Sequence, residues 1–268
     1  MHPGPGVAGW LLPALLVVVP AAAYLAGTVR LRARLGRRWS PLRTASAVLG
    51  LVLLAVALSP PVTAAAHADL RVHVVRHLLL GSFGPLALVL SAPVTLALGA
   101  SSTAVRRRIG AVLGSPAVAV LSHPVPAAVL STGGLYLLHA TGLFALSMRD
   151  PGVGALVDLH LVLAGCLFSW AVAGPDPSRH RASTAVRLAV LVLAGAAHGL
   201  LAKLLVAQEG RWPPGTSHPQ GQVEAAAQWM YYGGDLAELL LAVALLAGWY
   251  RTSGRRRPVV PAHGRGMR

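Results

Sequence analysis

The sequence has 268 residues, of which 55% are hydrophobic and only 12% are charged, and this composition excludes an ordinary soluble globular domain. The formal net charge of +15 lies in short basic clusters between long apolar runs, which excludes a nucleic-acid-binding surface and favours contact with a lipid bilayer. The single cysteine, Cys166, excludes a disulfide framework and any two-cysteine metal or redox motif.

Seven apolar segments are long enough to cross about 30 Å of hydrocarbon at 1.5 Å per residue. We expect tilt or breaks in the third and fourth, where Pro85, Pro93, Pro124 and Pro126 are candidate break points. The chain is therefore predicted to be an all-α, polytopic membrane helix bundle with seven transmembrane helices. The segments cover residues 7–29, 44–65, 71–98, 117–147, 153–173, 184–207 and 226–249.

Arginine clusters predict the orientation of these helices. Groups at 30–43, 106–108, 179–187 and after Trp249 hold most of the 23 basic residues and alternate with connections that are poor in basic residues. This positive-inside pattern places the N-terminus outside and the C-terminus in the cytoplasm. Residues 1–250 are predicted to form the membrane domain and residues 251–268 a basic, disordered cytoplasmic tail. Arginine-rich, almost lysine-free usage is typical of a high-GC bacterial genome, so we expect a bacterial cytoplasmic membrane.

Two histidines lie four residues apart in the third segment. His73 and His77 share one helical face, and Asp69 lies one turn before them. Imidazoles on adjacent turns can share a metal ion that a nearby carboxylate helps to orient. The alternative is a pair of interfacial histidines that bond to water and to neighbouring carbonyls.

Polar residues from five of the segments share one depth in the predicted outer half of the membrane. Because intramembrane ionisable groups are costly, their convergence favours a shared site over separate structural hydrogen bonds. We expect His67 and His218 in outside water and His123 near the cytoplasmic end, and we exclude these three. The residues of the layer, within about 14 Å of the outer helix ends at 1.5 Å per residue, are His73, His77, His139, His160, His198 and Asp235.

The last segment adds a second carboxylate. Asp235 and Glu238 lie three residues apart on one helical face, which should point into the bundle because carboxylates facing lipid are costly. The alternative is a structural ion pair with Arg76 or Lys203. We expect Asp158 nearer the surface, on a different face from His160.

Ligand chemistry limits the metal. Imidazole with carboxylate suits Zn(II), Cu(II) or iron, whereas Cu(I) usually recruits sulfur, here available as Met148 and Met230. The predicted ligands or second-shell groups of the metal are His73, His77, His139, His160, His198, Asp235 and Glu238. No catalytic triad or nucleotide-binding loop is recognisable, so we predict no catalytic residues and no enzyme.

The same residues resemble a known family, the CtaG-like cytochrome c oxidase assembly proteins. HVVRHLLL at 73–80, the following Pro-containing run, and the segments around His139, His160 and His198 are similar to those of the family from about residue 67 to residue 250. Val74 and Arg76 replace the family's usual Met and Gln, and Arg76 would repel a metal unless a carboxylate neutralises it. The resemblance implies copper delivery during oxidase assembly, with subunits of a haem-copper terminal oxidase as partners.

Two other functions are compatible with these residues. A haem-binding electron carrier would use two of the histidines as axial ligands. A metal or proton transporter would use Asp235, Glu238 and Lys203 as a relay. Copper, zinc and haem all remain open as cofactors on the residues alone.

Overall fold

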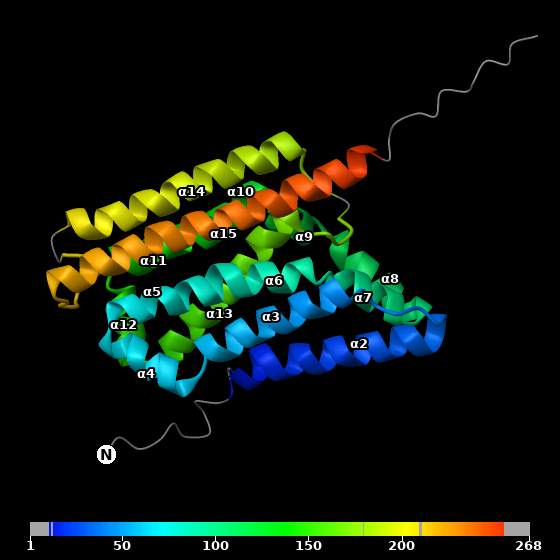
Figure 1. Ribbon diagram of the computed structural model, residues 1–268, viewed down its shortest axis with the longest axis horizontal. Helices are drawn as coiled ribbons and strands as arrows, with labels where there is room; N and C mark the ends of the chain where they lie inside the picture. Colours follow the sequence, from blue (N-terminus) through cyan, green and yellow to red (C-terminus); the bar gives the residue numbers. More distant parts are fainter. Residues whose placement is uncertain (1–10, 12, 179, 209–210, 255–268) are drawn as a thin grey trace, which may run out of the picture.

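Residues 11, 13–178, 180–208 and 211–254 are described by the computed structural model, and within them all regular secondary structure is helical. The predicted all-α class is confirmed. Five helical stretches are long and apolar enough to span a membrane: Ala14–Leu35, Leu70–Ala100, Pro151–Ala173, Thr184–Ala207 and Gln220–Arg251. Two bent helix pairs raise the count among the described residues to seven if each pair is one span. Figure 1 shows these stretches side by side in one bundle.

The first half of the chain contains the following helices: a π-helical turn η1 (Ala14–Val18), α2 (Val19–Leu35), α3 (Pro41–Ala57), α4 (Pro60–Ala68), α5 (Leu70–Leu78), a π-helical turn η2 (Leu79–Phe83), α6 (Gly84–Leu90), α7 (Pro93–Ala100), α8 (Thr103–Leu113) and α9 (Pro116–Leu121). The second half contains α10 (Pro124–Ala128), a π-helical turn η3 (Val129–Gly133), α11 (Gly134–Ala140), α12 (Leu143–Arg149), α13 (Pro151–Ala173), α14 (Thr184–Ala207) and α15 (Gln220–Gly254). The predicted tail boundary at residue 251 falls inside α15, and residues 255–268 lie outside the described part.

Two of the expected segments, the second and the fourth, are bent at places that were not predicted. Between α3 and α4 the chain bends by 54°, where two prolines begin α4 and supply no N–H to continue the ladder of α3. Between α11 and α12 it bends by 80° without any proline. There Thr141 is extended, and its hydroxyl accepts a hydrogen bond from the backbone N–H of Leu143 at 3.2 Å. A local side-chain cap thus replaces the helical hydrogen bond.

The third span contains one π-helical turn and one break. Pro85 follows the turn η2, and Pro93 begins α7 after Ala92, which has a left-handed φ of 56°. Helix α13 approaches the turn η2 so closely that a Cβ on Gly165 would collide with the carbonyl oxygen of Gly81. Glycine at position 165 therefore allows α13 to pack on the span that carries His73 and His77.

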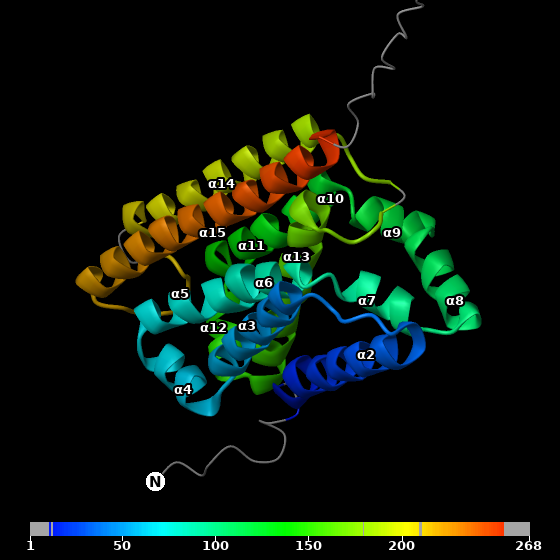
Figure 2. The ribbon, with the colours of Figure 1, turned by 45° about the vertical axis from the view of Figure 1, so that its right-hand side comes forward.

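The two ends of the bundle differ in charge. The arginine end, defined by the end of α2, by α8, by the connection 174–183 and by the end of α15, gathers the arginine clusters (Figure 1, right). The histidine end is defined by α4, the start of α5 and α12, and it lies opposite (Figure 2). The described arginines of these clusters thus lie toward one end of the bundle, while the side of the membrane that each end faces stays a prediction.

Candidate metal centre

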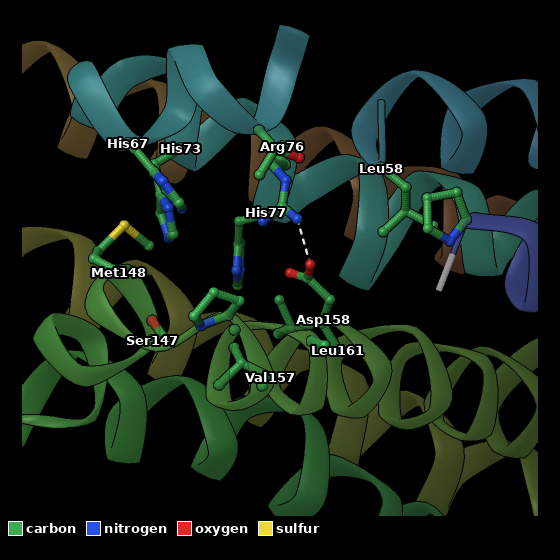
Figure 3. A pocket seen from close by; sticks show the side chains of 16 residues that line it. Leu58, His67, His73, Arg76, His77, Ser147, Met148, Val157, Asp158 and Leu161 are labelled. Atoms are coloured by element: carbon green, nitrogen blue, oxygen red, sulfur yellow. Dashed lines mark hydrogen bonds and ion pairs between the residues drawn. The ribbon is translucent and has the colours of Figure 1, made fainter. Parts of the chain in front are cut away.

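A cavity of about 400 Å³ lies at the histidine end, between the α4–α5 pair and the α12–α13 pair. Figure 3 shows His67, His73 and His77 projecting from the first pair toward Met148 and Ser147 on the second. His67 and Pro151 are exposed and line the cavity, so it reaches the surface at this end. The cavity therefore brings imidazole and thioether groups to an accessible depth.

His73 and His77 are buried in this cavity wall, with 5% and 4% of their surface exposed. Both ring nitrogens of His73 and Nδ1 of His77 are buried and have no hydrogen-bond partner among the described residues. A buried polar group without a partner costs about 1 to 3 kcal/mol. Such groups are rare in folded proteins, so these three nitrogens on adjacent turns need a partner that the described residues do not supply.

Arg76 is buried among the same histidines and is held by two contacts. Its Nε donates to the carbonyl oxygen of Ala57 at 2.9 Å, and its Nη2 forms an ion pair with Asp158 on α13 (Figure 3). Asp158 is 8% exposed whereas His160 is exposed, so the two residues lie on different faces of α13, as expected. The carboxylate that neutralises Arg76 is thus Asp158 rather than Asp69, Asp235 or Glu238.

Two further histidines lie deeper. The ring centroids of His139 and His77 are 6.2 Å apart, and Nδ1 of His139 is 2.9 Å from the carbonyl oxygen of Leu135. If Nδ1 carries the hydrogen, this bond leaves Nε2 of His139 as a free lone pair. His198 packs on Gly234, where a Cβ would collide with its ring. His77, His139 and His198 interact electrostatically with one another and therefore form the deeper part of the predicted layer.

Glu238 lies beside His198, with 3.9 Å between Oε1 and Nδ1. Its carboxylate also borders a small cavity of about 50 Å³ that is lined by hydroxyl groups of η2, η3 and α13. None of these hydroxyls makes a hydrogen bond to another described residue, and the space is sufficient for water. The hydroxyls belong to Ser82, Ser131, Thr132 and Ser169.

Three residues of the predicted constellation lie elsewhere. His160 is exposed on α13, with Nε2 3.1 Å from the carbonyl oxygen of Leu130. Asp235 is exposed on α15, although it remains an electrostatic neighbour of His198 and Glu238. Asp69 caps α5 and pairs with Arg71, which lowers the pKa of Asp69 below its usual value. Asp69 does not share the helical face of His73 and His77, because its backbone is extended and α5 begins only at Leu70.

Three residues that we had set aside or treated as secondary lie at the cavity or close to it. His67 and Met148 line the cavity, and His218, in the connection after α14, interacts electrostatically with His73. Nε2 of His218 is buried without a hydrogen-bond partner among the described residues. The position of His67 at the cavity could have been predicted from the two prolines at the start of α4, because the resulting bend lets α4 pack on α5.

Within the described part of the chain, no three side chains of His, Cys, Asp or Glu converge closely enough to hold a metal ion together. The arrangement therefore offers imidazoles singly or in pairs, with a thioether nearby.

Residues 22–252 match the family model described as cytochrome c oxidase caa3 assembly factor (Caa3_CtaG). The chain belongs to this family. Its membership confirms the resemblance drawn from the histidine segments and identifies the protein as a member of a group of oxidase assembly factors.

Curated relatives of this Caa3_CtaG member are uncharacterized mycobacterial proteins. The protein ML1998 of Mycobacterium leprae is 30% identical over 257 residues, which are 89% of this chain and 38% of the relative. Mb0105 of Mycobacterium bovis and MT0111 of Mycobacterium tuberculosis are each 33% identical over 181 residues, which are 65% of this chain and 27% of the relative. The chain thus spans less than two fifths of the length of these relatives. No solved structure matches it.

Proposed function

We propose that this Caa3_CtaG member binds copper in the cavity at the histidine end and supplies it for the assembly of cytochrome c oxidase. The observation that carries the proposal is the set of unpartnered, buried ring nitrogens of His73 and His77 beside that cavity. A bound metal would satisfy these nitrogens, because ligation requires the neutral imidazole with a free lone pair. The proposed location is the bacterial cytoplasmic membrane, with the histidine end outside.

The ligand set favours Cu(I). The chain brings histidine pairs together with Met148, whereas a tetrahedral Zn(II) site needs four converging ligands and Cu(II) prefers four in a plane. Thioether sulfur and imidazole together suit the softer, less coordinated Cu(I) ion. We therefore expect His67, His73 and Met148 to receive the ion at the surface, and His77 with His139 to hold it deeper.

Local charge is compatible with a cation. Arg76 lies next to both histidines, but its ion pair with Asp158 and its bond to the carbonyl of Ala57 neutralise and immobilise the guanidinium. A cation in the cavity therefore meets a paired arginine rather than an isolated positive charge. Arg76, which replaces the family's usual glutamine, is therefore compatible with the proposed copper site.

Copper retention tests the proposal directly. We expect the purified protein to retain Cu(I) against a competing chelator. The double variant His73→Ala/His77→Ala should lose at least about tenfold in affinity, because loss of groups that only orient a metal's ligands already costs that much. His160→Ala is the matched control, because this histidine is exposed and lies away from the cavity. Stoichiometric copper in the double variant would refute the named site, and a haem Soret band would indicate an electron carrier instead.

The role in assembly needs a cellular measurement. We expect a strain that lacks the protein to lose cytochrome c oxidase activity, and the His73→Ala/His77→Ala gene to restore little of it. The His160→Ala gene should restore activity. Normal activity in the deletion strain grown at limiting copper would contradict the assembly role for this chain.

A further inference from the structure

One carboxylate lies on the exposed surface of the bundle, within the last apolar segment. Asp235 is exposed on α15 and makes no hydrogen bond or ion pair with any residue that the structure describes, and its electrostatic neighbours, His198 and Glu238, supply no permanent positive charge. It lies about 14 Å from residue 226, where that segment begins, at 1.5 Å per residue. An aspartate side chain is too short to reach the interface from that depth.

Exposure of this group to lipid would be costly. Insertion of a charged side chain at the centre of a membrane helix costs about 2.5 to 3.5 kcal/mol. The neighbouring exposed side chains on the same face are large, with Tyr232 at 69% and Leu239 at 60% exposure. A partner that covers this face would therefore pair with Asp235 and pack on its apolar neighbours.

The adjacent helix exposes a cation close to α15. Lys203 on α14 is exposed, and its Nζ lies 5.5 Å from the ring centroid of Tyr231, one turn before Asp235. Helices α14 and α15 are antiparallel, since Gly195 packs on Glu238 and Gly199 on Tyr231. In this register Lys203 lies about 11 Å along the helix axes from Asp235.

Side-chain tilt brings the two charges toward a common depth. Side chains lean toward the N-terminus of their own helix, so Lys203 leans toward the level of Asp235 and Asp235 leans toward the level of Lys203. Within one chain the two do not pair, because the ammonium lies on the Tyr231 ring. The face is thus self-complementary in charge, which is what a two-fold symmetric interface requires.

We infer that two copies of this chain associate in the membrane through the exposed faces of α14 and α15. A two-fold axis along the bundle would place Lys203 of each copy against Asp235 of the partner subunit. Both charges would then be paired away from lipid, with Tyr232 and Leu239 packed at the same interface. The inference concerns a surface apart from the histidine cavity, and it does not depend on copper binding.

Crosslinking in native membranes tests the interface. In a Cys166→Ala background, we expect Leu239→Cys to give a disulfide- or bis-maleimide-linked dimer of this chain. Leu163→Cys is the matched control, because Leu163 is similarly exposed, at 57%, but lies on α13. Absence of a homodimer with Leu239→Cys, or crosslinks only to another protein, would overturn the inference.

Charge exchange tests the pairing itself. We expect Asp235→Lys or Lys203→Asp alone to lower the crosslinked fraction about tenfold, since two polar pairs per dimer are replaced by like charges. The double variant Asp235→Lys/Lys203→Asp should restore dimers, which also shows that the single variants did not merely misfold. Crosslinking that is insensitive to the single changes, or not restored by the double change, would refute the proposed pair.

Discussion

At the scale of single residues, the orientation of each helix about its own axis determines which polar side chains line the cavity. The depth of His73, His77, His139 and His198 follows from counting residues along a helix, and the structure brings these four near one another. The facing direction does not follow in the same way. Helix α13 is apolar around its circumference, so periodicity could not indicate that Asp158 is the buried residue and His160 the exposed one.

Because Arg76 and Asp158 form a buried ion pair, we expect removal of one partner to destabilise the protein and removal of both to restore much of the stability. Arg76→Ala should lower the free energy of unfolding by about 3 kcal/mol, because it leaves the buried carboxylate of Asp158 without a counter-charge. Arg76→Ala/Asp158→Asn should recover much of that loss, and detergent-micelle unfolding measures both. Arg71→Ala is the control, since its pair with Asp69 is exposed. An equal loss of stability in Arg76→Ala and Arg71→Ala would contradict a stabilising role for the buried ion pair.

At the scale of helices, the sequence indicated where the chain enters and leaves the bundle but not every bend. Proline marked the starts of α4, α7 and α10, because its missing N–H ends the preceding ladder. The 80° bend before α12 had no such signal, since it rests on one Thr141 hydroxyl and the geometry of a turn. As a result, the break before α12 was not expected where it occurs, and α4, although it begins with two prolines, was expected as part of a straight span.

Helix packing at η2 gives a second prediction. Gly165→Leu should destabilise the protein by more than about 2 kcal/mol, because a side chain there would push α13 away from Gly81 and Pro85. Gly110→Leu on α8 should have little effect, since a Cβ there meets no atom within 4 Å. Thermal unfolding in the same detergent compares the two. Similar melting temperatures for both variants would contradict the close approach.

At the scale of the whole molecule, charge separates the two ends and predicts how the bundle inserts. The arginine clusters gather at one end and the histidine cavity opens at the other (Figures 1 and 2). The positive-inside rule therefore predicts that the cavity faces the outside of the cell, the side on which we propose that copper is delivered.

Labelling of intact cells tests this orientation. A membrane-impermeant maleimide should react with Ser217→Cys, in the connection at the histidine end, and not with Ala104→Cys on α8 until the cells are permeabilised. A Cys166→Ala background removes the native thiol. The reverse pattern would place the cavity in the cytoplasm and would exclude delivery at the outer face.

The buried pair on α5 and α13 also has a consequence for sequence variation in the family. Where a relative carries the usual glutamine in place of Arg76, an aspartate at the position of Asp158 would be buried without a cation, which costs several kcal/mol. The two positions, 82 residues apart in the sequence, should therefore change together, arginine with aspartate and glutamine with a neutral residue. A lineage that changed only one of them would pass through a poorly folding intermediate, so most members should show one combination or the other.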